Sequence, residues 1–162
     1  MEFLNKLMTR TKKTVLGFAI AVFVCLLLVT VVLAGAATIG WKAAVRAGNE
    51  TAAIQTVRTI AAIERQYYNT HDRKFGTFEE LVNESLLDTR FRGGVPVVDG
   101  YAYRLTINQT TSNAQSTLVV TADPQDNSTG NNHFYLDSSS DEIRFNPDQT
   151  AGPSDAAWKK QP

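Results

Sequence analysis

The stretch WKAAVRAGNETAAIQTVRTIAAIERQYY, residues 41–68, decides how this chain folds. It contains no proline, and its apolar residues recur at helical spacing, so that they share one face of a helix. The residues of this face are Ala53, Val57, Ile60, Ala61 and Tyr68. The pattern predicts an amphipathic helix whose apolar face packs on the rest of a domain.

Upstream of this stretch lies a long apolar run. Residues 15–39 are almost wholly apolar and residues 14–41 carry no charge, and a helix of that length reaches about 37 Å. That is enough to cross a lipid bilayer. Residues 1–13 hold four basic side chains and one acidic side chain, so the positive-inside rule predicts a cytoplasmic head. We therefore expect a single-pass inner-membrane protein with a transmembrane helix over residues 14–40.

A removable secretory signal is the alternative interpretation of this run. Ala34, Gly35 and Ala36 supply the small residues of a cleavage site. The apolar stretch before Ala34 is 19 residues long, whereas the apolar region of a signal peptide has about 7 to 15 residues. The length favours an anchor, and cleavage after Ala36 stays open.

The second half of the chain changes to the period of two that is typical of strands. Apolar residues alternate with polar ones over residues 101–107, and further strand patterns cover 116–122, 133–137 and 142–145. The fold class predicted is α+β: a long amino-terminal helix packed on a small antiparallel sheet of three or four strands. We assign residues 41–150 to this extracytoplasmic domain and residues 151–162 to a flexible tail.

The chain offers little support for enzymatic chemistry. His71 and His133 lie in unrelated contexts, and Cys25 is the only cysteine, so neither a catalytic triad nor a metal cluster is indicated. Residues 105–162 hold three basic and seven acidic groups, which disfavours nucleic acid as a partner. We predict no enzyme activity and no cofactor.

One loop, residues 122–132, is rich in side-chain oxygens. It contains Asp123, Asp126, Asn127 and Asn131. Oxygen ligands of this kind can hold calcium, but the same residue types are common in ordinary turns. Their spacing does not match an EF-hand, so the sequence leaves both interpretations open and we assign no metal ligand.

Four segments together resemble type IV pilin-like proteins, a class that includes the pseudopilins of type II secretion. The segments are KKTVLGF at 12–18, AAIQTVRTIAAIERQYYNTHDRKFGTFEELV at 52–82, GYAYRLTI at 100–107 and FYLDSSSDEIRFNPDQTAGPSD at 134–155. The resemblance implies a structural subunit of a type IV pilus or type II secretion filament, a class that includes minor and capping subunits. Its implied partners are other pilin-like subunits, an inner-membrane assembly machinery and the lipid bilayer.

The resemblance also implies roles for individual residues. A leader peptidase would cut between Gly17 and Phe18, and the filament-core helix would contain Phe18, Val22, Phe23, Leu26 and Leu27. Family members usually carry a glutamate where this chain has Val22, and a basic residue usually stands beside the glycine. These departures fit a capping subunit. They also fit an unprocessed, membrane-anchored periplasmic interaction module, which is the alternative function.

The resemblance predicts that the native protein begins at Phe18. Intact-mass analysis of the native protein checks this directly. A mass that includes Met1 would favour the unprocessed module, and a start at Ala37 would favour a cleaved secretory signal.

Overall fold

The computed structural model describes residues 2–109 and 115–159, with side chains for 22–30, 40–109 and 115–159. The chain divides into two compact units, residues 1–43 and 44–162. Helix α1 (Glu2–Thr70) contributes to both units. Unit 1 consists of the first part of α1, and unit 2 contains the last part of α1 together with all the other elements.

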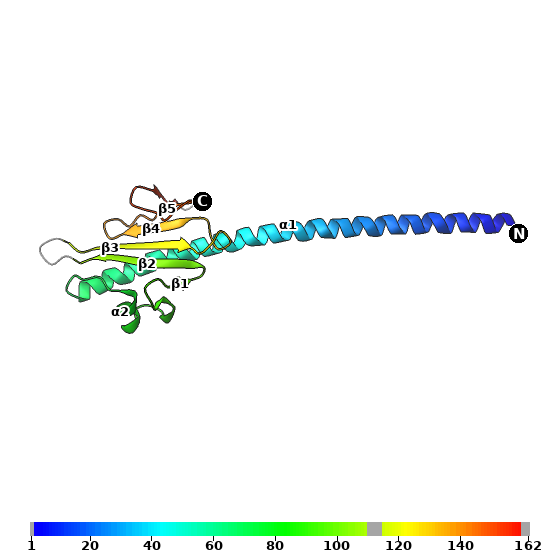
Figure 1. The fold of residues 1–162 in the computed structure, drawn as a ribbon. Coiled ribbons are helices and arrows are strands. Elements are labelled where there is room, and N and C mark those ends of the chain that lie inside the picture. Colours follow the sequence, from blue (N-terminus) through cyan, green and yellow to red (C-terminus); the bar gives the residue numbers. More distant parts are fainter. Residues whose placement is uncertain (1, 110–114, 160–162) are drawn as a thin grey trace. The chain divides into compact units, whose positions relative to one another are not determined.

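The sheet of unit 2 is an antiparallel meander of six strands, in the order in which they occur in the sequence (Figure 1). Its strands are β1 (Val97–Val98), β2 (Tyr101–Asn108), β3 (Thr117–Pro124), β4 (His133–Asp137), β5 (Arg144–Asn146) and β6 (Ala156–Ala157). The longest pairing joins β2 to β3, from Tyr101 opposite Pro124 to Asn108 opposite Thr117. Alternation along these strands sends Tyr101 and Tyr103 into the core, because successive side chains of a strand point to opposite faces.

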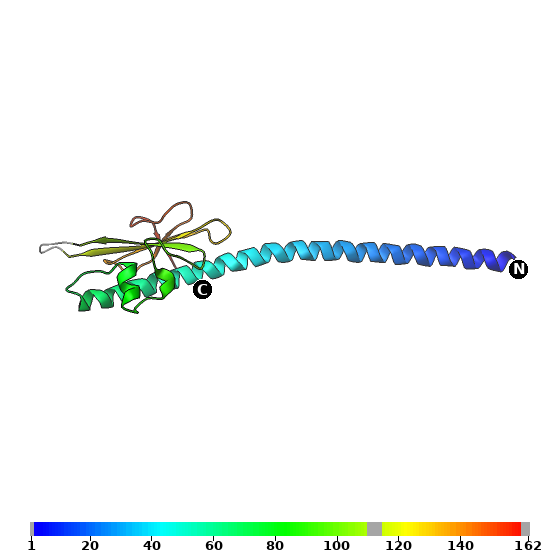
Figure 2. The same ribbon diagram turned by 60° about the horizontal axis from the view of Figure 1, so that its bottom comes forward.

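The last part of α1 covers one face of this sheet (Figure 2). Ala53, Val57 and Ile60 have no exposed surface, and Ala61 is 4% exposed. Tyr68 is partly buried and packs against the same core. From the sheet side, the core receives large side chains of three strands, namely Tyr101, Tyr103, Leu118, Val120, Phe134 and Leu136. Unit 2 is therefore built as two layers, one helical and one β.

Two short helical elements follow α1, namely α2 (Phe78–Asn83) and the 3-10 helix η1 (Thr89–Phe91). Thr77 and Glu80 form a capping box at the start of α2, and each side chain accepts a backbone hydrogen bond from the other residue. The elements bury Phe78, Leu81 and Phe91 beside the sheet. The capping box thus fixes the α2 end of the segment between α1 and α2.

The number of strands corrects the predicted fold. We expected three or four strands, and the sheet has six. The additional edge strands β1 and β6 have two residues each, which is too short to produce an alternating pattern. β6 also lies in the segment predicted to be a flexible tail, where Ala151 is buried and Trp158 packs edge-on against Phe134 and Phe145.

A second correction concerns the membrane. In the part of α1 whose side chains the structure describes, residues 22–30 and 40–70, no stretch is long and apolar enough to cross a bilayer. This finding contradicts the predicted transmembrane helix, and with it the single-pass inner-membrane localisation.

We expect unit 2 to fold without unit 1. Residues 44–162 expressed alone should be monomeric and should unfold in one cooperative transition, with a free energy of unfolding on the order of 5–10 kcal/mol, because helix and sheet bury a common core. Circular dichroism during a urea titration measures this. A fragment that lacks a cooperative transition would show that unit 2 depends on residues 1–43.

Candidate functional site

The first candidate site is an apolar segment of α1 in unit 1, residues 22–29. Every residue in it is apolar and exposed. The predicted filament-core residues described here are Val22, 42% exposed, Phe23, 63%, Leu26, 59%, and Leu27, 51%. Gly17 and Phe18 lie within α1, at positions outside those whose exposure the structure describes.

Residues 22–29 thus form an exposed apolar surface, which other apolar groups would cover. Eight consecutive residues make more than two helical turns, so their side chains point in every direction around the axis. A helix that is hydrophobic on all sides is normally buried on all sides. Within the described residues of unit 1, the segment has no such cover.

The second candidate site begins at Glu64, which the sequence analysis missed. Glu64 follows Ala53, Val57 and Ile60 at the same helical spacing, so the face that packs on the sheet carries a carboxyl group in its last turns. Its side chain has no exposed surface. The sequence carries a signal for this site, because a glutamate stands at a position of the apolar face and glutamate is rarely buried.

Glu64 is incompletely paired. The Gly76 N–H donates to Glu64 Oε2 at 2.9 Å, whereas no described group forms a hydrogen bond with Oε1. Burial raises the pKa of Glu64 from 4.5 to about 7, against the Gly76 hydrogen bond, which lowers it, and with a smaller upward contribution from the negative charge of Glu80. Glu64 is therefore a carboxyl group that changes charge near neutral pH.

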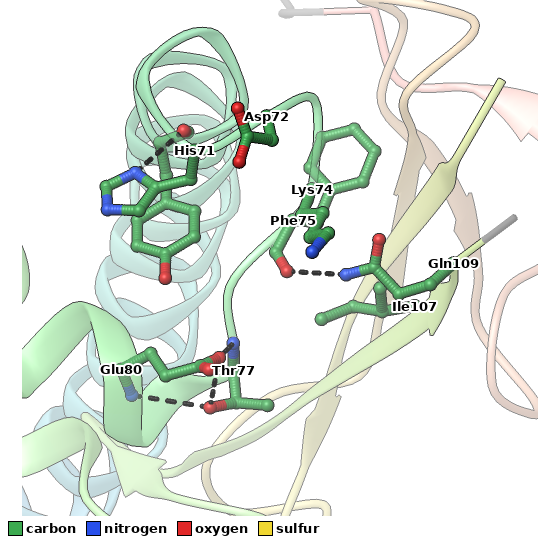
Figure 3. A pocket seen from close by; sticks show the side chains of 9 residues that line it. His71, Asp72, Lys74, Phe75, Thr77, Glu80, Ile107 and Gln109 are labelled. Carbon is green, nitrogen blue, oxygen red and sulfur yellow. Dashed lines mark hydrogen bonds between the residues drawn. The ribbon is translucent and has the colours of Figure 1, made fainter. Parts of the chain in front are cut away.

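A pocket of about 500 Å³ lies next to this region, between the end of α1, the start of α2 and the end of β2 (Figure 3). Its lining combines aromatic, aliphatic and charged side chains of Tyr67, His71, Asp72, Lys74, Phe75, Thr77, Glu80, Ile107 and Gln109. The His71 ring stacks on Tyr67, with ring centroids 3.8 Å apart, and His71 Nε2 lies 3.0 Å from Glu84 Oε1. Charges of both signs share this pocket, so it does not select an anion or a cation by charge alone.

The oxygen-rich loop at 122–132 is engaged in internal hydrogen bonds. Asp123 Oδ1 lies 2.6 Å from His133 Nδ1, and Asp126 Oδ1 accepts hydrogen bonds from the Ser128 backbone and hydroxyl at 2.7 and 2.5 Å. Glu50 on α1 accepts from the Asn131 N–H at 2.8 Å and from the Asn132 side chain at 2.9 Å. The loop is thus fastened to α1. Among the described residues, no three His, Cys, Asp or Glu side chains are placed to hold a metal ion together.

We predict that Glu64 makes stability fall as the pH rises. Between pH 4.5 and about 7 the folded protein retains a proton that the unfolded chain has lost, so the free energy of unfolding decreases by about 1.4 kcal/mol per pH unit, or about 3 kcal/mol in all, and then levels off. Urea unfolding at a series of pH values should show this contribution in the full chain. If the free energy of unfolding of the full chain and that of Glu64→Gln change equally over this pH range, the prediction is wrong.

Comparison with known proteins gives no family: no family model, no curated protein and no solved structure matches this chain.

Proposed function

We propose that this protein is a structural subunit of the pilin or pseudopilin kind, which polymerises through residues 22–29 of α1. The observation that carries the proposal is the exposure of this segment on all sides of the helix. Its partners are further copies of the chain or related subunits that present similar apolar helices.

The all-round apolar surface favours several neighbours over a single one. A two-stranded coiled coil buries one narrow apolar seam and leaves the rest of each helix in water. Here a single partner helix would leave most of the side chains between Val22 and Val29 exposed. A bundle of helices from successive subunits surrounds each segment, and burying each side chain there contributes about 1 kcal/mol, because roughly half of its surface is free.

A filament also accounts for the contrast between the exposed apolar segment of unit 1 and the buried core of unit 2. Repeated head-to-tail contacts that do not close into a ring generate an open helical polymer. In such a polymer the apolar segments form the interior, while unit 2, which completes its own core, can stay folded on the outside. The proposed subunit therefore uses α1 twice, once for the fold of unit 2 and once for assembly.

The pocket near Tyr67 favours a second candidate, a binding module that does not polymerise. Its volume of about 500 Å³ is within the range of small-molecule sites. This candidate leaves the exposure of residues 22–29 unexplained, so we rank it below the filament subunit.

The filament proposal predicts that Leu27→Asp abolishes polymerisation. A charge at this position would be buried without a partner in the helical interior, which costs several kcal/mol and should raise the concentration needed for assembly more than tenfold. Gln55→Asp is the matched control, because it places the same charge at an exposed position of α1 in unit 2. Electron microscopy and sedimentation of the full chain should show ordered filaments for the unmodified protein and for Gln55→Asp.

Three outcomes would contradict the filament. The unmodified chain could stay monomeric at high concentration, it could form aggregates without helical order, or Leu27→Asp could polymerise as well as Gln55→Asp. A monomer that binds a small molecule through the Tyr67 pocket would support the second candidate instead.

A further inference from the structure

The segment between α1 and α2, residues 71–77, is a strap held in an unusual backbone conformation. Asp72 and Arg73 have φ values of 51° and 60°, in the left-handed region that side chains other than glycine rarely adopt. Two such residues in succession persist where surrounding contacts hold them. The contacts that hold the strap therefore decide whether it stays closed.

Two side chains from other elements fasten the middle of the strap, at Phe75 and Gly76. Gln109, just beyond β2, donates from Nε2 to the Phe75 carbonyl at 2.8 Å, as Figure 3 shows. Glu64 on α1 accepts from the Gly76 N–H at 2.9 Å. Gly76 is also packed tightly, since a Cβ atom there would lie 3.1 Å from both Leu81 and Tyr67. The fastening at Gly76 thus seals Glu64 inside the protein.

The closed strap accommodates a neutral carboxyl group at Glu64, but it destabilises a carboxylate there. Glu64 has no exposed surface, and its Oε1 has no hydrogen-bond partner among the described residues. A negative charge there has one N–H donor in place of the several water molecules it would have in solvent. Opening the strap at Gly76 would admit that water.

We propose that the strap is a pH-gated latch, which stays fastened while Glu64 is protonated and opens as Glu64 becomes charged. The groups that face this region are the Glu80 carboxylate of α2, Tyr67 at the end of α1, and His71, Asp72 and Lys74 on the strap itself. Glu80 is anionic, because hydrogen bonds from the Thr77 N–H and hydroxyl lower its pKa. The negative charge of Glu80 therefore further destabilises the closed strap once Glu64 is charged.

The size of the effect follows from linkage. Closed, the strap keeps the pKa of Glu64 at about 7, and once the strap is open and the group hydrated the pKa returns to its ordinary value of 4.5. The ratio of open to closed strap then rises about 70-fold between pH 5 and pH 8. Because residues of the strap line the pocket beside it, the latch would also change the shape of that pocket.

Hydrogen–deuterium exchange of the full chain tests the latch. After correction for the intrinsic pH dependence of amide exchange, peptides covering residues 71–77 should lose protection about 70-fold between pH 5 and pH 8. Peptides from β2 and β3 serve as the internal reference and should keep their protection. In Glu64→Gln the loss of strap protection should disappear.

His71 provides the matched control, because it lies on the strap itself and its Nε2 is 3.0 Å from Glu84 Oε1. His71→Gln should retain the pH dependence of strap exchange. If Glu64→Gln does not fold, Glu64→Met removes the same charge with an apolar side chain of similar length. A strap with constant protection in the unmodified chain, a dependence that persists in the Glu64 variants, or its loss in His71→Gln would each overturn the proposal.

Discussion

The structure depends on the contact between one face of α1 and the sheet. Val57 and Ile60 of the helix share a core with Tyr103 and Val120 of the sheet, and all four side chains are without exposed surface. A helix in a protein owes most of its stability to the packing of its apolar face, and an isolated meander has one apolar face to cover. Each layer therefore supplies what the other lacks. The loops of unit 2 are attached to α1 by hydrogen bonds. Glu50 accepts one from the Asn131 N–H, and Glu64 accepts one from the Gly76 N–H.

Much of unit 2 could be predicted from the sequence, because its main elements have strong periodic patterns. The helical spacing from Ala53 to Ala61 and the alternation along residues 101–107 both mark side chains that the structure buries. The capping box at Thr77 is a local motif, which a threonine followed three residues later by a glutamate marks in the sequence. The edge strands β1 and β6 could not be predicted, because two residues are too few to show an alternating pattern. Their pairing depends on neighbouring strands that are already in place.

The candidate site was less accessible to sequence analysis. Glu64 lies on the apolar face of α1, but its one hydrogen-bond donor is Gly76, which packs against Tyr67 and Leu81 from two different elements. The oxygen-rich loop shows the opposite case. Its composition permitted calcium, whereas Asp123 is engaged by His133 and Asp126 by its own turn. Composition names the available ligands, and tertiary contacts decide how they are used.

A titration of Glu64 is the most direct test of this account, because this carboxyl group lies on the face of α1 that packs on the sheet and has no exposed surface. Carbon-detected NMR of the labelled side chain across pH 4 to 9 reports its pKa without any variant. We expect a midpoint near 7. A midpoint close to the ordinary value of 4.5 would show that water reaches Glu64, and would contradict both the sealed core and the latch built on it.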